Sequence, residues 1–281
     1  MSAIATETDF EVAYLGPEGS FSHLAAKLRY PGKSLIAFRT VPEIFAYVKN
    51  HPEGKGIVPI ENSSGGLILH TVDGIIEHAC SLFIEEELSL DVKLALLAAK
   101  PGPIHTIYSH FAPLYHCEPF LREKYPDART VPCTSTTAAA EAAMKEEGAA
   151  SIGPIGTAEI YSLQILEYPL RENVPNVTQF FVLSQQRQLP ALGEKTSLVV
   201  ALENRPGSLH EFLGPFARAA VNLTRIESRP IMGQPNTYRF LIEVIGTDDN
   251  PSIAAAFTEA QAVSTYFQNV GNYPVTPRFQ S

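Results

Sequence analysis

The fold is predicted most directly by the stretch Gly56-Ile-Val-Pro-Ile-Glu-Asn-Ser-Ser-Gly-Gly66. Its first part, up to Ile60, is a short apolar run typical of a buried strand, and the rest is a polar loop of small residues. Open α/β sheets bind their ligands in loops at the carboxyl ends of the strands. The stretch therefore predicts a ligand-binding loop directly after a buried strand.

Alternating strands and helices surround this stretch. Upstream, the strand Val12-Ala-Tyr-Leu15 leads through the turn Gly16-Pro-Glu-Gly-Ser20 into a helix, and Thr40-Val-Pro-Glu43 is a capping box that begins a second helix. Downstream, further strands are expected at 104–108, 149–152 and 178–184. Short polar loops between such elements predict a largely parallel sheet, or two of them.

A polar segment, Gln185-Gln-Arg-Gln-Leu-Pro190, separates this region from a second pattern. Beyond it, the sequence predicts strand, helix, strand, strand, helix and a last strand before Pro277. This is the order of a ferredoxin-like βαββαβ unit. The sequence therefore predicts two domains, over residues 10–185 and 195–281.

Composition excludes several classes of protein. The chain has 281 residues, of which 45% are hydrophobic, and a net charge of −9. Such a protein has no general attraction for nucleic acid or anionic lipid, so an anionic ligand needs local positive charge or backbone N–H groups. The first ten residues lack the apolar core of a signal peptide, and no apolar run is long enough to span a membrane. The three cysteines are widely spaced, so a cytoplasmic location without disulfides is expected.

Two motifs in the second domain point to an amino-acid ligand. They are Asn204-Arg-Pro-Gly-Ser-Leu209, before a predicted helix, and Asn222-Leu-Thr-Arg-Ile-Glu-Ser-Arg-Pro230, after it. A glycine at a helix start lets a carboxylate approach free N–H groups. Taken alone, each motif is equally well explained as a turn glycine or a salt-bridged strand end. Together they resemble the ACT domain of phenylalanine-inhibited prephenate dehydratases, although Ser208 replaces the usual alanine.

This resemblance implies L-phenylalanine as the effector and names the residues that bind it. They are Asn204, Gly207, Ser208, Leu209, Asn222, Glu227, Ser228 and Arg229. A homodimer, or a dimer of dimers, is also implied.

The first domain resembles the catalytic part of the same family throughout. The matching motifs are Gly16-Pro-Glu-Gly-Ser-Phe-Ser22, Gly56 to Ser63 with Gly66, Cys133-Thr-Ser-Thr-Thr-Ala138, Ala158-Glu-Ile-Tyr161 and Asn176-Val-Thr-Gln-Phe180. The resemblance implies a two-lobed α/β fold like that of type II periplasmic binding proteins, with crossovers near 88–92 and 168–175. The active cleft is then expected between the lobes.

The implied reaction is the conversion of prephenate to phenylpyruvate, without a metal or cofactor. The enzyme must hold two carboxylates and protonate a departing hydroxide. By resemblance, Thr178 assists the leaving group. The implied substrate-binding residues are Ser20, Asn62, Ser63, Thr136, Gln179 and Phe180. Each serine or threonine has a plainer alternative role, which is to cap the helix behind it.

Several positions depart from the family pattern. Gln179 replaces an arginine and Pro154 a serine, Phe111 and Ala112 replace Pro-Gln, and Lys93 stands where histidine is common. Glutamine lacks the permanent charge and the bidentate fork of arginine. Two alternatives therefore stay open: a non-aromatising prephenate decarboxylase and a catalytically inactive amino-acid sensor. The sequence also does not determine whether the substrate is prephenate or arogenate, or whether the effector inhibits or activates the protein.

Overall fold

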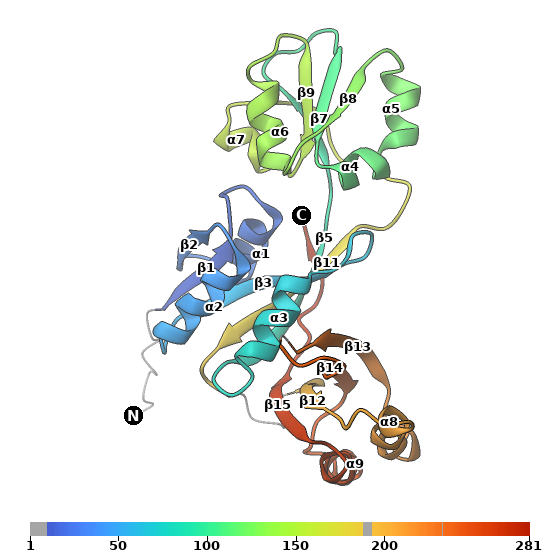
Figure 1. The fold of residues 1–281 in the computed structure, drawn as a ribbon. Coiled ribbons are helices and arrows are strands. Elements are labelled where there is room, and N and C mark those ends of the chain that lie inside the picture. Colours follow the sequence, from blue (N-terminus) through green and yellow to red (C-terminus); the bar gives the residue numbers. More distant parts are fainter. Residues whose placement is uncertain (1–9, 188–192, 232) are drawn as a thin grey trace, which may run out of the picture.

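The structure is a computed structural model, and it describes residues 10–187, 193–231 and 233–281. Its strands form three separate sheets, one for each of two lobes and one for a C-terminal domain (Figure 1). The predicted polar linker at 185–190 lies partly outside the described residues.

The first lobe is built on a seven-stranded mixed sheet in the order β16-β5-β11-β3-β1-β2, with β4 paired to β3. Its strands are β1 (Glu11–Leu15), β2 (Ser34–Phe38), β3 (Lys55–Asn62), β4 (Gly66–Leu67), β5 (Phe83–Asp91), β11 (Val177–Ser184) and β16 (Phe279–Gln280). Its helices are α1 (Phe21–Arg29), α2 (Val41–Asn50) and α3 (Leu69–Glu77). The predicted capping box begins α2, with Thr40 and Glu43 bonding each other's backbone.

The second lobe is built on a five-stranded sheet in the order β10-β6-β9-β7-β8. Its strands are β6 (Ala95–Ala98), β7 (Thr106–Ser109), β8 (Arg129–Pro132), β9 (Ala149–Gly153) and β10 (Gln164–Glu167). Its helices are α4 (Phe111–His116), α5 (Glu118–Lys124), α6 (Thr136–Ala143) and α7 (Thr157–Ile160). The chain passes between the lobes twice, from β5 to β6 and from β10 back to β11.

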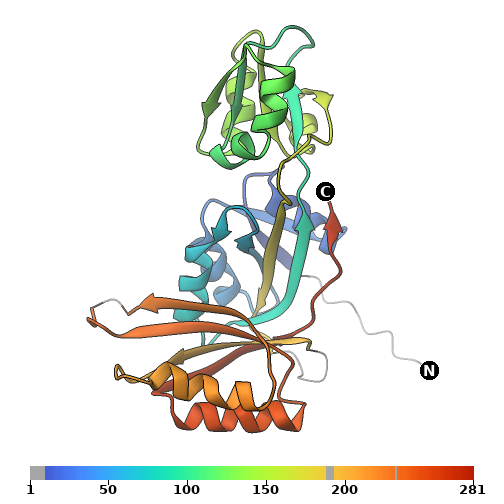
Figure 2. The ribbon, with the colours of Figure 1, turned by 90° about the vertical axis from the view of Figure 1, so that its right-hand side faces the viewer.

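The C-terminal domain has the predicted ferredoxin-like order. Its elements are β12 (Lys195–Ala201), α8 (Ser208–Arg218), β13 (Leu223–Pro230), β14 (Tyr238–Ile245), α9 (Pro251–Ala262) and β15 (Tyr266–Tyr273). The four strands pair in the order β13-β14-β12-β15, and both helices cover one face of this sheet (Figure 2). After β15 the chain returns to the first lobe, where β16 pairs with β5.

The other face of the C-terminal sheet packs against the first lobe. Alternate residues of β12 separate the two faces, because Leu198 and Val200 pack under the helices while Val199 lies in a core shared with the first lobe. The shared core also holds Phe181 of β11 and Tyr273 of β15, whose rings lie edge to face at 5.6 Å. The C-terminal sheet therefore buries both faces, one of them on the first lobe.

The two regions approach each other tightly at Gly271 of β15. A Cβ atom at this position would run into the backbone carbonyl oxygen of Ile84 on β5, well inside van der Waals distance. Because the obstacle is backbone, it has little freedom to move aside. Only glycine fits here without shifting the two sheets apart.

We therefore expect Gly271→Ala to lower the free energy of unfolding by about 1–3 kcal/mol through overpacking. Urea unfolding followed by circular dichroism measures the change. Gly156→Ala is the matched control, because its Cβ would enter open space and its φ of −61° is already helical, so it should change stability by less than about 0.5 kcal/mol. Equal effects of the two substitutions would contradict the tight contact.

Candidate active site

The end of β3 and the start of β11 bring two predicted site residues together. In the antiparallel pair, Asn62 lies opposite Thr178. The Asn62 Nδ2 atom donates to Thr178 Oγ1 at 2.9 Å and to Asn176 Oδ1 at 2.9 Å. Thr178 and Asn176 are both more than nine-tenths buried. The pairing of the two strands thus holds these three side chains in one place.

The hydrogen bonds of Asn62 determine which atom of Thr178 is free to act. The Asn62 Oδ1 atom accepts from the backbone N–H groups of Ser64 and Gly65, at 3.0 and 2.8 Å. Its NH₂ group must therefore face Thr178, whose Oγ1 is the acceptor. The hydroxyl proton of Thr178 is consequently available to donate to another group.

A buried carboxylate that sequence analysis did not single out orients Asn176. Asn176 Nδ2 donates to Glu172 Oε2 at 2.9 Å, which leaves its Oδ1 facing Asn62. Burial raises the pKa of Glu172, against the opposing effects of Asn176, His116 and Lys93. His116 Nδ1, on α4 of the second lobe, lies 3.5 Å from Glu172 Oε2 and makes no hydrogen bond within the described residues. A line of polar groups therefore runs from the second lobe through the crossover to Thr178.

A cavity of roughly 340 Å³ lies between the lobes. From the first lobe it is lined by the turn before α1, including Ser20, and by His23 and Lys27 of α1. From the second lobe it is lined by residues 154–156 and by Glu159 and Ile160. His23 Nδ1 accepts from the Gly19 N–H at 3.0 Å, so a neutral ring carries its proton on Nε2. Burial lowers the pKa of His23, which favours this neutral ring.

The remaining predicted substrate residues have structural partners. Ser20 caps α1 by accepting from the His23 N–H at 3.2 Å, and it also donates to Leu15 O. Ser63 Oγ donates to Pro175 O and accepts from the Val177 N–H, both at 2.9 Å. Thr136 begins α6, next to Gly153 at the end of β9. Phe180 is 1% exposed, in the core of the first lobe.

Gln179 lies on the opposite face of β11 from Thr178, as expected for neighbouring residues of a strand. Its Oε1 accepts from Arg225 of β13 at 3.1 Å, and its Nε2 donates to Glu87 of β5 at 3.3 Å. This face is the one on which the C-terminal sheet packs. The structure therefore does not bring the Gln179 side chain together with Asn62 and Thr178.

The first effector motif forms a small pocket in the C-terminal domain. Asn204, Ser208 and Leu209 line a cavity of roughly 160 Å³ together with Tyr238 and Phe240 of β14. Gly207 precedes α8 with a φ of +89°, a conformation that favours glycine. The Ser208 hydroxyl is buried and has no hydrogen-bond partner among the described residues.

The second predicted effector motif lies on β13, two strands away from β12, which leads into the first motif. Glu227, Ser228 and Arg229 are on this edge strand, and β14 separates them from β12. Asn222 precedes β13, and its carbonyl accepts from the Ile245 N–H at 2.9 Å. Arg229 makes a bidentate pair with Asp73 of α3, with distances of 2.6 and 3.0 Å.

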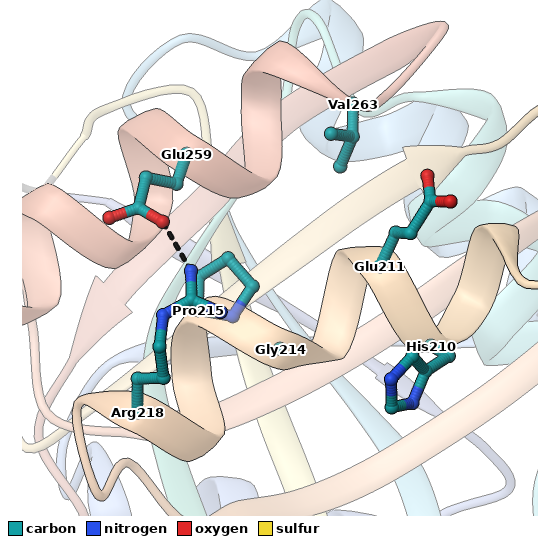
Figure 3. Close-up of a pocket in the computed structure, with 7 residues that line it drawn as sticks. All are labelled: His210, Glu211, Gly214, Pro215, Arg218, Glu259 and Val263. Carbon is teal, nitrogen blue, oxygen red and sulfur yellow. Dashed lines mark hydrogen bonds and ion pairs between the residues drawn. The ribbon is translucent and has the colours of Figure 1, made fainter.

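A further groove lies on the outside of the C-terminal domain, between α8 and α9 (Figure 3). Arg218 of α8 and Glu259 of α9 form an ion pair across it (Figure 3). In the described ranges, no group of three or more His, Cys, Asp or Glu side chains is arranged to hold a metal ion. No described helix has the length and apolar character needed to cross a membrane.

Comparison with known proteins identifies the family. The family model for prephenate dehydratase matches residues 12–188, and that for the ACT domain matches residues 196–260. The chain belongs to the prephenate dehydratase family. The bifunctional chorismate mutase/prephenate dehydratase of Stutzerimonas stutzeri is 34% identical over 276 residues, which are 97% of this chain and 75% of that protein.

Two solved structures extend the likeness to three dimensions. The prephenate dehydratase from Arthrobacter aurescens, in complex with L-Phe, has a TM-score of 0.83 and 30% identity over 94% of this chain and 90% of that one. GqqA, described as a novel type of quorum quenching acylase, has a TM-score of 0.84 and 26% identity over 95% of this chain and 98% of that one. The expected fold, a two-lobed catalytic region followed by an ACT domain, is confirmed.

The buried Glu172 predicts a distinct dependence of stability on pH. Its raised pKa means that the folded protein holds this proton more tightly than the unfolded chain. The stability that the protonated group contributes is therefore lost as pH rises through the folded pKa. Glu172→Gln, which imitates the protonated form, should become progressively more stable relative to the unsubstituted protein from pH 4 to pH 8.

Urea midpoints measured across this range test the trend. Glu123→Gln serves as the control, because Glu123 is an exposed carboxylate paired with Arg171. It should show no such trend, and a flat difference for Glu172→Gln as well would contradict the buried-acid interpretation.

Proposed function

We propose that the chain converts prephenate to phenylpyruvate, carbon dioxide and water, and that Thr178 assists the departing hydroxyl. The observation that carries this proposal is the hydrogen bond from Asn62 Nδ2 to Thr178 Oγ1 at 2.9 Å. Because the oxygen of Thr178 is already an acceptor, its proton points toward another partner. That partner, in this proposal, is the 4-hydroxyl of the substrate.

The chemistry requires little beyond positioning and one proton. The bond from the ring to its carboxylate breaks, and the electron pair forms the new ring double bond as the carbon–oxygen bond opposite breaks. The hydroxyl leaves as water after taking up one proton, so the reaction consumes one proton in total. A hydrogen bond that strengthens as charge develops on the leaving oxygen lowers the barrier to this step.

Two carboxylates of the substrate need partners in an acidic protein. The interlobe cavity supplies Lys27 as a cation and His23 as a donor through Nε2. Pro154, which replaces a serine of the family, lines the same cavity without a donor. We propose that substrate bridges this cavity and the Asn62–Thr178 pair, and so draws the two lobes together. Ser20, Ser63 and Thr136 remain predicted contacts of this site. Gln179 and Phe180 do not, because Gln179 faces the C-terminal sheet and Phe180 is buried in the core.

The ACT domain is proposed to bind L-phenylalanine and to reduce turnover when it does so. The support is the pocket at Asn204, Ser208 and Leu209, where the buried Ser208 hydroxyl has no described partner. The start of α8 offers backbone N–H groups to a carboxylate. A homodimer that joins this pocket to the second motif, and a cytoplasmic location, are parts of the same proposal.

The deciding experiment is incubation of the purified protein with prephenate at neutral pH. Products are identified by ultraviolet spectrum and mass. Phenylpyruvate formed well above the uncatalysed rate supports the dehydratase. A non-aromatic decarboxylated product supports the decarboxylase alternative instead. Phenylalanine binding by calorimetry without any turnover supports the sensor.

Thr178→Val tests the proposed role of the hydroxyl. Valine has the same shape but cannot donate, so kcat should fall by about 10²–10³ while KM changes little. Initial rates of phenylpyruvate formation give both constants. Thr178→Ser keeps the donor and should retain most of the activity, whereas a fully active Thr178→Val would exclude the hydroxyl from the mechanism.

A further inference from the structure

Six side chains join the ACT sheet to the catalytic sheet, and we call them the interdomain cluster. Three come from the catalytic sheet and three from the ACT sheet. The members are Glu61 of β3, Glu87 of β5, Gln179 of β11, Lys195 of β12, Arg225 of β13 and Glu243 of β14. Five of them close a ring, from Arg225 through Gln179, Glu87, Lys195 and Glu243 back to Arg225, and Glu61 joins at Arg225.

Arg225 contacts two strands of the catalytic sheet. Its side chain is only 6% exposed. Nη1 donates to Glu243 at 2.9 Å, while Nη2 donates to Glu61 at 2.9 Å and to Gln179 at 3.1 Å. Its guanidinium carbon lies 5.4 Å from the centre of the Phe181 ring. One planar group from the ACT domain therefore contacts both β3 and β11.

These contacts lie on the opposite face of the sheet from the proposed catalytic pair, Asn62 and Thr178. Glu61 precedes Asn62 and lies opposite Gln179, while Asn62 lies opposite Thr178. Neighbouring residues of a strand face opposite sides of the sheet. Arg225 therefore contacts the Glu61–Gln179 pair on one face of the sheet, while the neighbouring Asn62–Thr178 pair faces the other side. A shift of Arg225 would therefore act on the two strands next to the site.

The strand that carries Arg225 also carries the second effector motif. Arg225 and Arg229 are four residues apart on β13 and bind different parts of the catalytic region, since Arg229 pairs with Asp73 of α3. Between them stands Glu227, one of the predicted effector residues. A movement of β13 would therefore act on both contacts.

Charge balance in the cluster makes the position of Arg225 critical. Three carboxylates face two cations, and Gln179 supplies no charge. Burial, and then the repulsion of Glu243, raise the pKa of Glu87, against Lys195 and Arg225. Burial opposes the ionisation of Glu243, but Arg225 and Lys195 outweigh it and lower the pKa of this group.

We propose that Arg225 is a positioning residue that transmits the state of the ACT domain to the Asn62–Thr178 pair through Glu61 and Gln179. The proposal rests on the proposed function, because it names the link between the proposed effector and the proposed active site. Arg225 contacts neither, so its effect is on their coupling. Couplings of this kind usually amount to about 5- to 150-fold.

The test uses the full chain with prephenate as substrate and phenylalanine as effector. Glu61→Gln is the first variant, because Glu61 is 42% exposed and its loss leaves the buried pairs of Arg225 intact. Phenylalanine should still bind in calorimetry, but its effect on turnover should fall by about five-fold or more. Arg225→Met should give the same loss. The double variant should lose no more than either single one, because both remove one link.

Arg218→Met is the matched control. Arg218 also pairs with a glutamate within the ACT domain, but on its outer helices and away from the catalytic sheet (Figure 3). This variant should keep the full phenylalanine effect. Variants that fold, bind phenylalanine and respond like the unsubstituted protein would overturn the proposal.

A second measurement separates this proposal from the proposed function. Hydrogen exchange of residues 58–62 and 177–181 reports on the two strands whether or not prephenate is turned over. Phenylalanine should change exchange there in the unsubstituted protein, and Glu61→Gln should abolish the change. If prephenate is not turned over but this pattern is found, the proposed reaction fails and the coupling stands. If phenylalanine binds and exchange does not change, the coupling is wrong.

Discussion

The structure depends on the alternation of side chains along β11, a central strand whose two faces pack against different parts of the protein. Phe180 and Val182 pack in the core beneath α1, whereas Phe181 and Leu183 pack in the core shared with the ACT domain. The same alternation directs Thr178 toward Asn62 and Gln179 toward Arg225. A slip of one residue would exchange these two side chains, placing a hydroxyl among buried charges and the longer amide beside Asn62. Apolar packing on both faces therefore fixes the register on which the chemistry depends.

The contact between the ACT sheet and the catalytic sheet combines two kinds of interaction. Apolar residues such as Val199, Leu241 and Val270 supply burial, which is favourable but has no preferred direction. Buried charges are costly unless each finds a well-placed partner, so they tolerate few arrangements. Lys195 of the ACT sheet pairs with Glu87 of the catalytic sheet at 2.8 Å and with Glu243 of its own sheet at 3.0 Å, so its ammonium group restricts how the two sheets are placed. The charged pairs thus fix the relative position of the two sheets, which apolar burial alone would not determine.

Local sequence patterns predict most elements and mark Asn62 and Thr178, which the structure brings together. Thr40 and Glu43 mark the start of a helix within four residues, and the loop after Ile60 follows directly from its strand, so both could be predicted from short stretches. The strands β2, β4, β10 and β16 are not predicted, because short strands such as the two-residue β4 and β16 are defined by their partners and not by their own composition. Glu172 and Arg225 were missed for a related reason. The sequence around a single charged residue does not show that the residue is buried, because burial depends on a partner that the fold brings next to it. One such partner of Arg225 is Glu61, 164 residues away in the sequence.

The contacts of Gln179 in the structure change the interpretation of this substitution. In the sequence this glutamine replaces an arginine, which predicts the loss of a charged contact to a substrate carboxylate. In the structure its amide accepts from Arg225 and donates to Glu87, so it needs both an acceptor and a donor. Arginine has no acceptor, and at this position it would face the guanidinium of Arg225. Glutamine at 179 and arginine at 225 are therefore complementary. Because the resulting cluster keeps more carboxylates than cations, Arg225 cannot be lost without leaving buried negative charge poorly balanced, which ties the docking of the ACT domain to this one side chain.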